Sequence, residues 1–262
     1  MNLLALPAFA DNYIWMLHDG ASAAVVDPGE AGPVHEALDR LGLQLAAILV
    51  THHHADHVGG VDELRARLRG PVYGPATEII PEPVHRLIEG EQIEVLGLRF
   101  DVIDVPGHTA GHIAYMQAVA DLPVESAEPP ILFCGDTLFS AGCGRLFEGT
   151  PKQMATSLAK LAGLPARTRV CCTHEYTLSN LRFAAAVEPG NARRRDYDAR
   201  CAALRSSGQP TLPSSIGTEL QVNPFLRCTE PEVAASALAQ GAASAEPLAV
   251  FTALREWKNH FR

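Results

Sequence analysis

Thr51-His52-His53-His54-Ala55-Asp56-His57 is the stretch around which the rest of the sequence can be arranged. Four imidazoles and a carboxylate within seven residues are typical of a metal site, since imidazole is the commonest metal-binding side chain at neutral pH. A branched apolar run from Leu45 to Val50 precedes the stretch and predicts a buried strand. Apolar residues at helical spacing follow it over residues 61–68. We therefore expect the histidines on a loop between a strand and a helix, where α/β proteins place their chemistry.

Alternation along an extended segment separates the histidines of this loop into two groups. His52 and His54 share one side and His53 faces the other, so we expect the first two to be ligands and His53 not. Asp56 and His57 follow where the chain turns into the helix, and they predict a second ligand set and a second metal. The alternatives are a solvated polar loop and a purification tag, but a tag does not fit a mid-chain position beside a buried strand.

Three further strand ends deliver histidine or aspartate. The segment from Val105 to His112 carries two histidines, Asp136 follows the apolar run 131–133, and His174 follows the run 170–172. Taken singly, each has another explanation, such as a loop-capping aspartate or a hydrogen-bonded buried histidine. Together, four strand ends with such residues indicate one shared site.

Composition limits the class of protein. The chain has 262 residues with 47% hydrophobic content, enough for a large core in one domain or in one domain with an appendage. A net charge of −9 argues against a broad nucleic-acid surface, although a local basic pocket is compatible with it. No run approaches the ~20 apolar residues of a membrane span, and the first ten residues predict an opening strand of a cytoplasmic protein. The six cysteines lack a Cys-x-x-Cys pair, which favours buried thiols in a reducing compartment.

The predicted elements suggest a mixed α/β fold in two parts. Residues 1–175 are rich in short strands, including a hairpin around Gly97, with helices at 33–41 and 151–161 and an acidic loop from Asp121 to Pro130. Residues 176–262 are rich in alanine and predict successive helices, among them 178–187, 193–204 and 231–239.

Four motifs, in this order and spacing, resemble the metallo-β-lactamase superfamily, and within it the hydroxyacylglutathione hydrolase (glyoxalase II) family. They are Thr-His-x-His-x-Asp-His (51–57), Pro-Gly-His-Thr-x-Gly-His (106–112), Gly-Asp-Thr-Leu-Phe (135–139) and His-Glu-Tyr-Thr (174–177). The stretches 142–150, 223–225 and 255–258 extend the resemblance over essentially the whole chain. It implies an αββα metallo-β-lactamase sandwich over residues 1–175 and a helical glutathione-binding domain over residues 176–262.

The resemblance also implies a site with two divalent metal ions. It assigns His52, His54 and His108 to one ion and Asp56, His57 and His174 to the other, with Asp136 bridging and His112 supporting a ligand. Zinc is expected, and the ligand types also admit iron or manganese. Two such ions lie ~3.5–4 Å apart and supply hydroxide as the nucleophile, so Asp56, which would orient the hydroxide, and Asp136 are the expected catalytic residues.

The implied activity is hydrolysis of S-(2-hydroxyacyl)glutathione thioesters such as S-D-lactoylglutathione, giving glutathione and D-lactate, in methylglyoxal detoxification. We expect a monomer without nucleic-acid or membrane partners. The implied substrate-binding residues are Arg145, Phe147, Tyr176, Asn180, Arg255 and Lys258. Some members carry tyrosine where this chain has Phe147, so one hydroxyl contact is missing, while the backbone at this position can still bind. For Arg255 and Lys258 the alternative is a solvated face of a terminal helix.

Three other functions compete with this interpretation. A glutathione persulfide dioxygenase shares the first motif but uses one iron and generally lacks the helical domain. A nuclease of the superfamily requires a larger basic surface than this sequence offers. A catalytically silent metal-binding interaction module fits less well, because a structural zinc site normally closes with four ligands whereas seven positions are filled here.

Overall fold

The computed structural model describes residues 1–118 and 128–261, so most of the acidic loop expected from Asp121 to Pro130 lies outside the described residues. The chain divides into two compact units. The N-terminal unit comprises Met1–Asp104 and Ala110–Gly135, and the C-terminal unit comprises Val105–Thr109 and Asp136–Arg262. The domain boundary expected between residues 175 and 176 stays a prediction.

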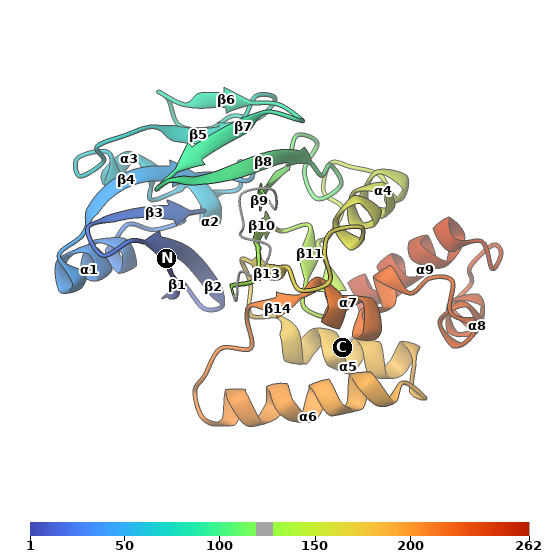
Figure 1. Ribbon diagram of the computed structural model, residues 1–262. Helices are drawn as coiled ribbons and strands as arrows, with labels where there is room; N and C mark the ends of the chain where they lie inside the picture. Colours follow the sequence, from blue (N-terminus) through green and yellow to red (C-terminus); the bar gives the residue numbers. More distant parts are fainter. Residues whose placement is uncertain (119–127, 262) are drawn as a thin grey trace. The chain divides into compact units, whose positions relative to one another are not determined.

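A six-stranded sheet in the order β1-β2-β3-β4-β5-β6 forms the frame of the N-terminal unit (Figure 1). Its strands are β1 (Asn2–Ala8), β2 (Asn12–His18), β3 (Ser22–Val26), β4 (Gln44–Leu49), β5 (Val72–Pro75) and β6 (His85–Leu87). β1 confirms the expected opening strand and pairs antiparallel with β2. β3 and β4 are parallel, and their last residues, Val26 and Leu49, are register partners. Asp27 and the histidine loop therefore leave the sheet at the same edge.

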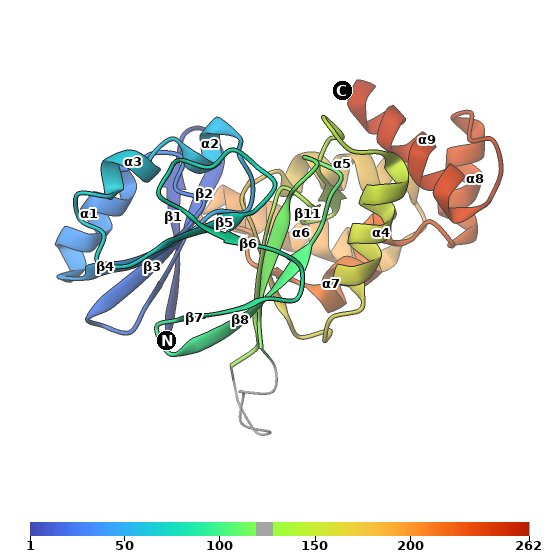
Figure 2. The ribbon, with the colours of Figure 1, turned by 90° about the horizontal axis from the view of Figure 1, so that it is seen from above.

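Helices α1 (Gly32–Leu41), α2 (Ala55–Val58) and α3 (Val61–Leu64) belong to the same unit. α1 confirms the predicted helix at 33–41 and lies near α3 (Figure 2). Its Val34 and Leu38 are buried in one apolar cluster with Val61 and Leu64 of α3. The helix predicted over residues 61–68 is wrong in extent, because it ends at Leu64. Beyond it, Leu68 forms a parallel bridge with Leu45, so pairing with the sheet replaces the last helical turn.

Four antiparallel strands complete the N-terminal unit: β7 (Gln92–Val95), β8 (Leu98–Asp104), β9 (Ile113–Gln117) and β10 (Ile131–Gly135). The turn between β7 and β8 has positive φ at Leu96 (52°) and Gly97 (73°), as a type I′ hairpin requires, which confirms the predicted hairpin. β9 reaches the histidine loop, because Ile113 N donates to Thr51 O at 3.0 Å and Tyr115 Oη donates to Val50 O at 2.9 Å.

The C-terminal unit is mainly helical. Its elements are β11 (Leu138–Phe139), β12 (Gly142–Cys143), α4 (Pro151–Ala162), β13 (Arg169–Cys172), α5 (Thr177–Val187), α6 (Ala192–Ser206), β14 (Ser214–Ser215), α7 (Ile216–Val222), the 3₁₀ helix η2 (Pro224–Leu226), α8 (Pro231–Ala239) and α9 (Pro247–His260). These bounds confirm the helices predicted at 151–161, 178–187, 193–204 and 231–239. α5 and α6 run side by side (Figure 1). α7 was not predicted, since a single short segment containing Gly217 gives a weak helical pattern.

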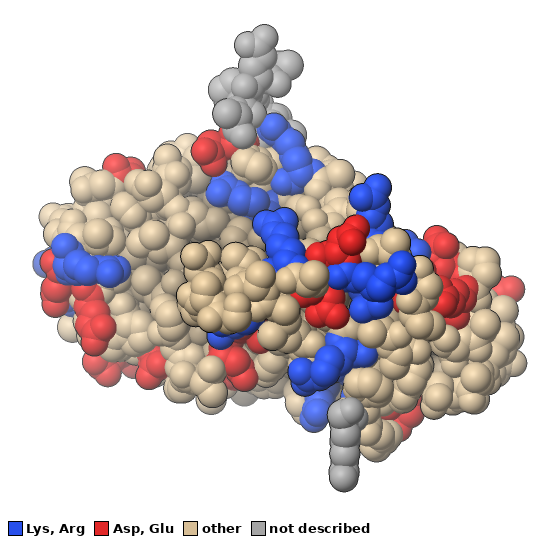
Figure 3. All heavy atoms as spheres, turned by 90° about the horizontal axis from the view of Figure 1, so that it is seen from below, with Lys and Arg blue, Asp and Glu red and all other residues tan. Residues whose placement is uncertain are grey.

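Charged side chains of both signs lie on the surface, and the cysteines lie inside. Basic and acidic side chains are interspersed over the face drawn in Figure 3. All six cysteines are buried thiols. Among the described residues, none of the helices combines the length and the apolar character that a membrane span needs.

Candidate metal centre

A buried aspartate at the end of β3 organises the histidine loop. Asp27 Oδ1 accepts a hydrogen bond from Thr51 N at 2.8 Å, and its Oδ2 accepts one from Thr51 Oγ1 at 2.8 Å. The same Oδ2 lies 3.1 Å from His57 Nδ1. One carboxylate thus fixes both the start of the loop and the orientation of His57, and it leaves His57 Nε2 to face a metal ion.

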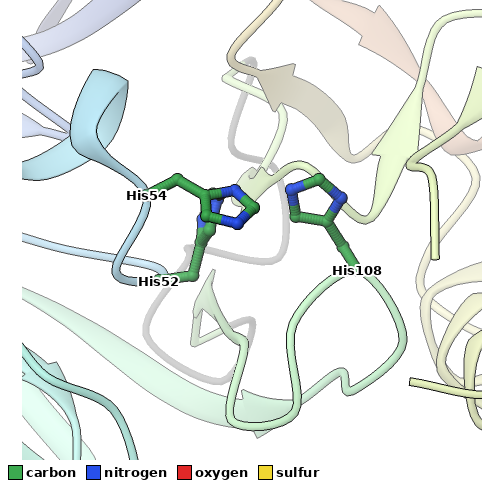
Figure 4. Close-up of side chains that lie close together, drawn as sticks. All are labelled: His52, His54 and His108. Carbon is green, nitrogen blue, oxygen red and sulfur yellow. Dashed lines mark hydrogen bonds between the residues drawn. The ribbon is translucent and has the colours of Figure 1, made fainter. Parts of the chain in front are cut away.

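His52 and His54 lie together, as strand alternation predicts. Figure 4 draws their two rings side by side on the loop before α2, with His52 Nε2 3.1 Å from His54 Nδ1. His52 is fully buried, and its Nδ1 lies 3.1 Å from Thr51 Oγ1. His112 stacks on the His52 ring at a centroid distance of 4.5 Å, so it packs behind a proposed ligand.

Asp56 and His57 form the second part of this cluster. His57 is fully buried, and its Nε2 lies 3.6 Å from Asp56 Oδ2. Asn12 at the start of β2 donates from Nδ2 to the same carboxylate oxygen at 3.1 Å. The His52 and His57 ring centroids are 4.0 Å apart, so the two predicted ligand sets of this unit adjoin one another.

His53 has different partners from its neighbours. Its backbone N–H donates to Glu78 Oε2 at 2.7 Å, and its Nδ1 lies 3.0 Å from the same oxygen. The other oxygen of the buried Glu78 carboxylate accepts from Gly111 N at 3.0 Å. Glu78 therefore ties the histidine loop to the turn before His112.

Three predicted ligands lie together in the C-terminal unit. Asp136 Oδ2 is 3.4 Å from His108 Nε2 and 3.3 Å from His174 Nε2. His108, which Figure 4 also draws, has its Nδ1 2.9 Å from the Arg145 carbonyl oxygen. A carbonyl only accepts, so Nδ1 carries the proton and Nε2 is the nitrogen available to a metal.

Aromatic side chains surround these three residues. Tyr176 stacks on the His174 ring with a centroid distance of 4.6 Å and an interplanar angle of 4°. Phe139 meets the same ring edge-on at 5.8 Å. Phe147 meets the His108 ring at 5.3 Å and is 63% exposed, so its outer face can contact a substrate.

The predicted basic residues differ in their exposure. Arg145 is exposed, whereas Arg255 is buried and donates from Nη1 to the carbonyl oxygens of Cys143 at 2.8 Å and Gly144 at 3.4 Å. Lys258 Nζ lies 3.4 Å from Ser179 O. Burial and, to a smaller extent, the positive charges of Arg255, Arg182 and Arg145 together lower the pKa of Lys258 to about 8. The unit thus holds a cluster of positive charge.

Asn180, the remaining predicted substrate residue, is buried, and its Nδ2 donates to Ser140 O at 3.0 Å. Its direct contact with a substrate, like that of Arg255, stays a prediction.

The supporting carboxylates are the residues that sequence reasoning missed. Neither Asp27 nor Glu78 is among the site residues predicted from the sequence. Asp27 offered one usable signal, an acidic residue directly after a branched apolar run, as at Asp136. Glu78 stands 25 residues from its partner His53 and outside any motif.

The chemistry of the buried side chains fits divalent metal ions. The His52 and His54 atoms belong to one set of potential ligand atoms within 4.8 Å of one another, and those of Asp56 and His57 to another. Buried imidazoles held this close, with carboxylates beside them, are the donors that zinc, iron and manganese share. The His/Asp clusters thus indicate divalent-metal binding.

Comparison with known proteins gives a consistent result over the whole chain. Residues 9–174 match the metallo-beta-lactamase superfamily, and residues 175–261 match the hydroxyacylglutathione hydrolase C-terminus. The hydroxyacylglutathione hydrolase of Albidiferax ferrireducens is 60% identical over 261 residues, 100% of both chains. That of Pseudomonas aeruginosa is 56% identical over 98% of each chain.

Solved structures agree with this fold. The BLEG-1 B3 metallo-beta-lactamase has a TM-score of 0.61 at 25% identity, covering 86% of this chain and 99% of that one. TTHA1623, crystallised in a di-iron-bound form, has a TM-score of 0.57 at 27% identity, covering 86% of this chain and 100% of that one. Together with the sequence matches, they confirm the expected metallo-β-lactamase fold with a helical C-terminal part.

Proposed function

Because the chain belongs to the hydroxyacylglutathione hydrolase family of the metallo-β-lactamase superfamily, we propose that it hydrolyses S-(2-hydroxyacyl)glutathione thioesters such as S-D-lactoylglutathione to glutathione and the 2-hydroxy acid. The observation that carries this function is the 60% identity over the full lengths of both chains. The protein is thus a metal-dependent hydrolase.

We propose that the chain binds two divalent metal ions, with zinc as the ion. His52, His54 and His108 would hold one ion, and Asp56, His57 and His174 the other. Asp136 would serve both, and its Oδ2 already lies within 3.4 Å of a ring nitrogen of His108 and of His174. When bound, such ions supply hydroxide at neutral pH and polarise the carbonyl group that is attacked.

The residues of the chain contribute orientation. The Asp27 carboxylate holds His57, the Arg145 carbonyl oxygen holds His108, and Asn12 holds the Asp56 carboxylate. These contacts fix which ring nitrogen of each histidine faces the site, and they restrict the Asp56 oxygen that would accept a hydrogen bond from the nucleophile. The departing thiolate has a conjugate-acid pKa near ~8.5, so its protonation is a small demand.

Glutathione binding is assigned to the C-terminal unit. Glutathione carries two carboxylates and one ammonium group, so the positive charges of Arg145 and Lys258 favour it. Phe147 and Tyr176 present exposed aromatic surface beside His108 and His174, and Asn180 completes the proposed set. Arg255 is buried against the Cys143 and Gly144 carbonyl groups, which adds a structural task to its proposed contact with glutathione.

The proposal also covers the domain boundary, the oligomeric state and the cellular location. We assign residues 1–175 to the metal-binding domain and residues 176–262 to the glutathione-binding domain. We also propose that the protein is a monomer. We propose a cytoplasmic location as well, because free, buried cysteine thiols fit a reducing compartment.

Metal analysis combined with a thioester-hydrolysis assay tests the proposal. The parent protein is expected to hold about two metals per chain and to hydrolyse S-D-lactoylglutathione, whereas Asp136→Ala should lose metal from both positions because each ion would lose a shared ligand. One metal per chain with full activity would refute the dinuclear site. Absence of hydrolysis by the fully loaded parent would refute the substrate assignment.

The alternative functions are not favoured, since the relatives named hydroxyacylglutathione hydrolase are 51–60% identical over essentially the full length. Oxygen consumption with glutathione persulfide distinguishes the dioxygenase. We expect no uptake above the rate without enzyme.

A further inference from the structure

The segment between Asp136 and Arg145 is held by side chains from four different helices. Residues 138–145, here called the hairpin segment, contain β11 and β12, which pair through Leu138 with Cys143 and Phe139 with Gly142. The two-stranded ladder is too short to be stable by itself. Its geometry therefore depends on the surrounding helices.

α5 and α6 both bond Ser140, one at its carbonyl group and the other at its hydroxyl group. Asn180 of α5 donates to Ser140 O at 3.0 Å, and Tyr197 of α6 lies 2.9 Å from Ser140 Oγ. The remaining backbone bonds come from α9, through Arg255, and from the α7 end, through Glu219 and Asn223.

The bonds from the α7 end reach the turn itself. Asn223 Nδ2 donates to Phe139 O at 3.2 Å and Gly142 O at 2.9 Å. Glu219 Oε2 accepts from Ala141 N at 2.8 Å and from Asn223 Nδ2 at 3.1 Å. Both Glu219 and Asn223 are fully buried.

The turn needs this support, because Ala141 has φ +56°. A residue with a Cβ is strained in the left-handed region, and such strain persists only when the surroundings fix the backbone. The Glu219 carboxylate bonds the N–H of that residue, while Asn223 bonds the carbonyl groups on either side of the turn. These two side chains thus determine how the hairpin segment is folded.

The far end of the hairpin segment orients His108. Gly144 N donates to Thr137 O at 3.2 Å, and the next carbonyl group, that of Arg145, accepts from His108 Nδ1 at 2.9 Å. A Cβ on Gly144 would lie 2.0 Å from Asp136 O, so the segment has little space in which to shift. A change in the turn is therefore transmitted to the hydrogen bond that selects the His108 tautomer.

We propose that Glu219 and Asn223 are positioning residues: by fixing the hairpin segment they hold the Arg145 carbonyl group against His108, so the C-terminal helices set the geometry of a metal ligand as well as binding substrate. The inference rests on the proposed function, because it takes His108 as a ligand. Neither residue is expected to touch the substrate.

The test compares Glu219→Ala with Glu188→Ala, because alanine removes the acceptor oxygen whereas glutamine would keep one. Glu188 is also buried in the C-terminal unit and bonds Arg227 and Asn191, neither of which belongs to the hairpin segment. Zinc affinity is measured on each loaded protein by competition with a chromogenic chelator, and backbone exchange over residues 139–144 by deuterium uptake and mass spectrometry. We expect Glu219→Ala to weaken the binding of one of two zinc ions about 10- to 100-fold and to speed exchange in the segment, since loss of a residue that supports a ligand has this effect. Glu188→Ala should lower the unfolding temperature and leave both quantities unchanged.

Equal zinc affinity in Glu219→Ala and the parent would overturn the inference. Equal weakening in Glu188→Ala would overturn it too, because it would indicate a general loss of stability. If Glu219→Ala does not fold, Tyr197→Phe decides, since it removes only the hydroxyl beside Ser140. We expect zinc affinity to fall roughly two- to fivefold, as for one neutral hydrogen bond, and unchanged affinity overturns the inference. A parent that binds two zinc ions but hydrolyses no glutathione thioester would refute the substrate assignment alone. A parent that binds none would overturn both.

Discussion

Lys258 is expected to make glutathione binding depend on pH at an unusually low value for a lysine. Its pKa is lowered to about 8, first by burial and then by the charges of Arg255, Arg182 and Arg145. The ammonium form is the one that attracts a glutathione carboxylate, so the attraction is present below pH 8 and is lost as the pH rises through that value. Lys258→Arg keeps its charge over the whole range, because a guanidinium does not titrate below pH ~12.

The size of the effect follows from this pKa. With a pKa of about 8, the charged fraction of Lys258 falls from about 90% at pH 7 to about 10% at pH 9, so kcat/KM should fall about tenfold relative to the variant. The loss of one charge-assisted hydrogen bond, worth ~1.5–3 kcal/mol, permits a fall of roughly 10- to 150-fold. Between pH 7 and pH 9 the fall in kcat/KM is therefore set by the charged fraction of Lys258 and not by the strength of the lost hydrogen bond.

The assay is the initial rate of S-D-lactoylglutathione hydrolysis by Lys258→Arg and parent at pH 6.5 to 9, after equal metal content has been confirmed. Titration of the nucleophile and of the substrate affects both proteins equally, so the ratio of their kcat/KM values isolates Lys258. A small thioester without the glutathione carboxylates serves as the control substrate, for which the ratio should stay constant. A ratio that does not change with pH for the glutathione ester would refute the reasoning.

Three further outcomes are expected. Burial raises the pKa of Glu219 to about 7, so the folded state binds this proton more tightly than the unfolded state, and the free energy of unfolding falls as pH rises from ~4.5 to 7. Glu219→Gln does not titrate, so between pH 5 and pH 8 its free energy of unfolding, measured by urea titration, should increase relative to that of the parent by up to about 3 kcal/mol. Parallel pH curves for the two proteins would contradict this. Glu78→Gln should cost ~2–4 kcal/mol of unfolding free energy, because an amide cannot accept all three N–H bonds of the buried carboxylate, and the exposed control Glu91→Gln should cost no more than ~0.5 kcal/mol. His54→Ala should remove most hydrolysis and His53→Ala little, and equal losses would show that strand alternation does not separate the two rings.

The sequence by itself determined the donor residues and their local arrangement. Strand alternation placed His52 and His54 on one side of an extended segment, and the structure shows their rings adjacent while His53 turns to Glu78. These features could be predicted because side-chain direction repeats every two residues along a strand, so neighbours in sequence suffice. The motifs also indicated the family, which the full-length relatives confirm.

Tertiary structure decided which side chains hold those donors in place. Asp27 contacts Thr51 across 24 residues and Glu219 contacts Ala141 across 78, and no local pattern announces either pairing. It also decided that Arg255 is buried while Arg145 is exposed, although both are arginines in family motifs. The physical reason is that burial and long-range hydrogen bonds depend on how distant segments pack, whereas periodicity and turn chemistry are local.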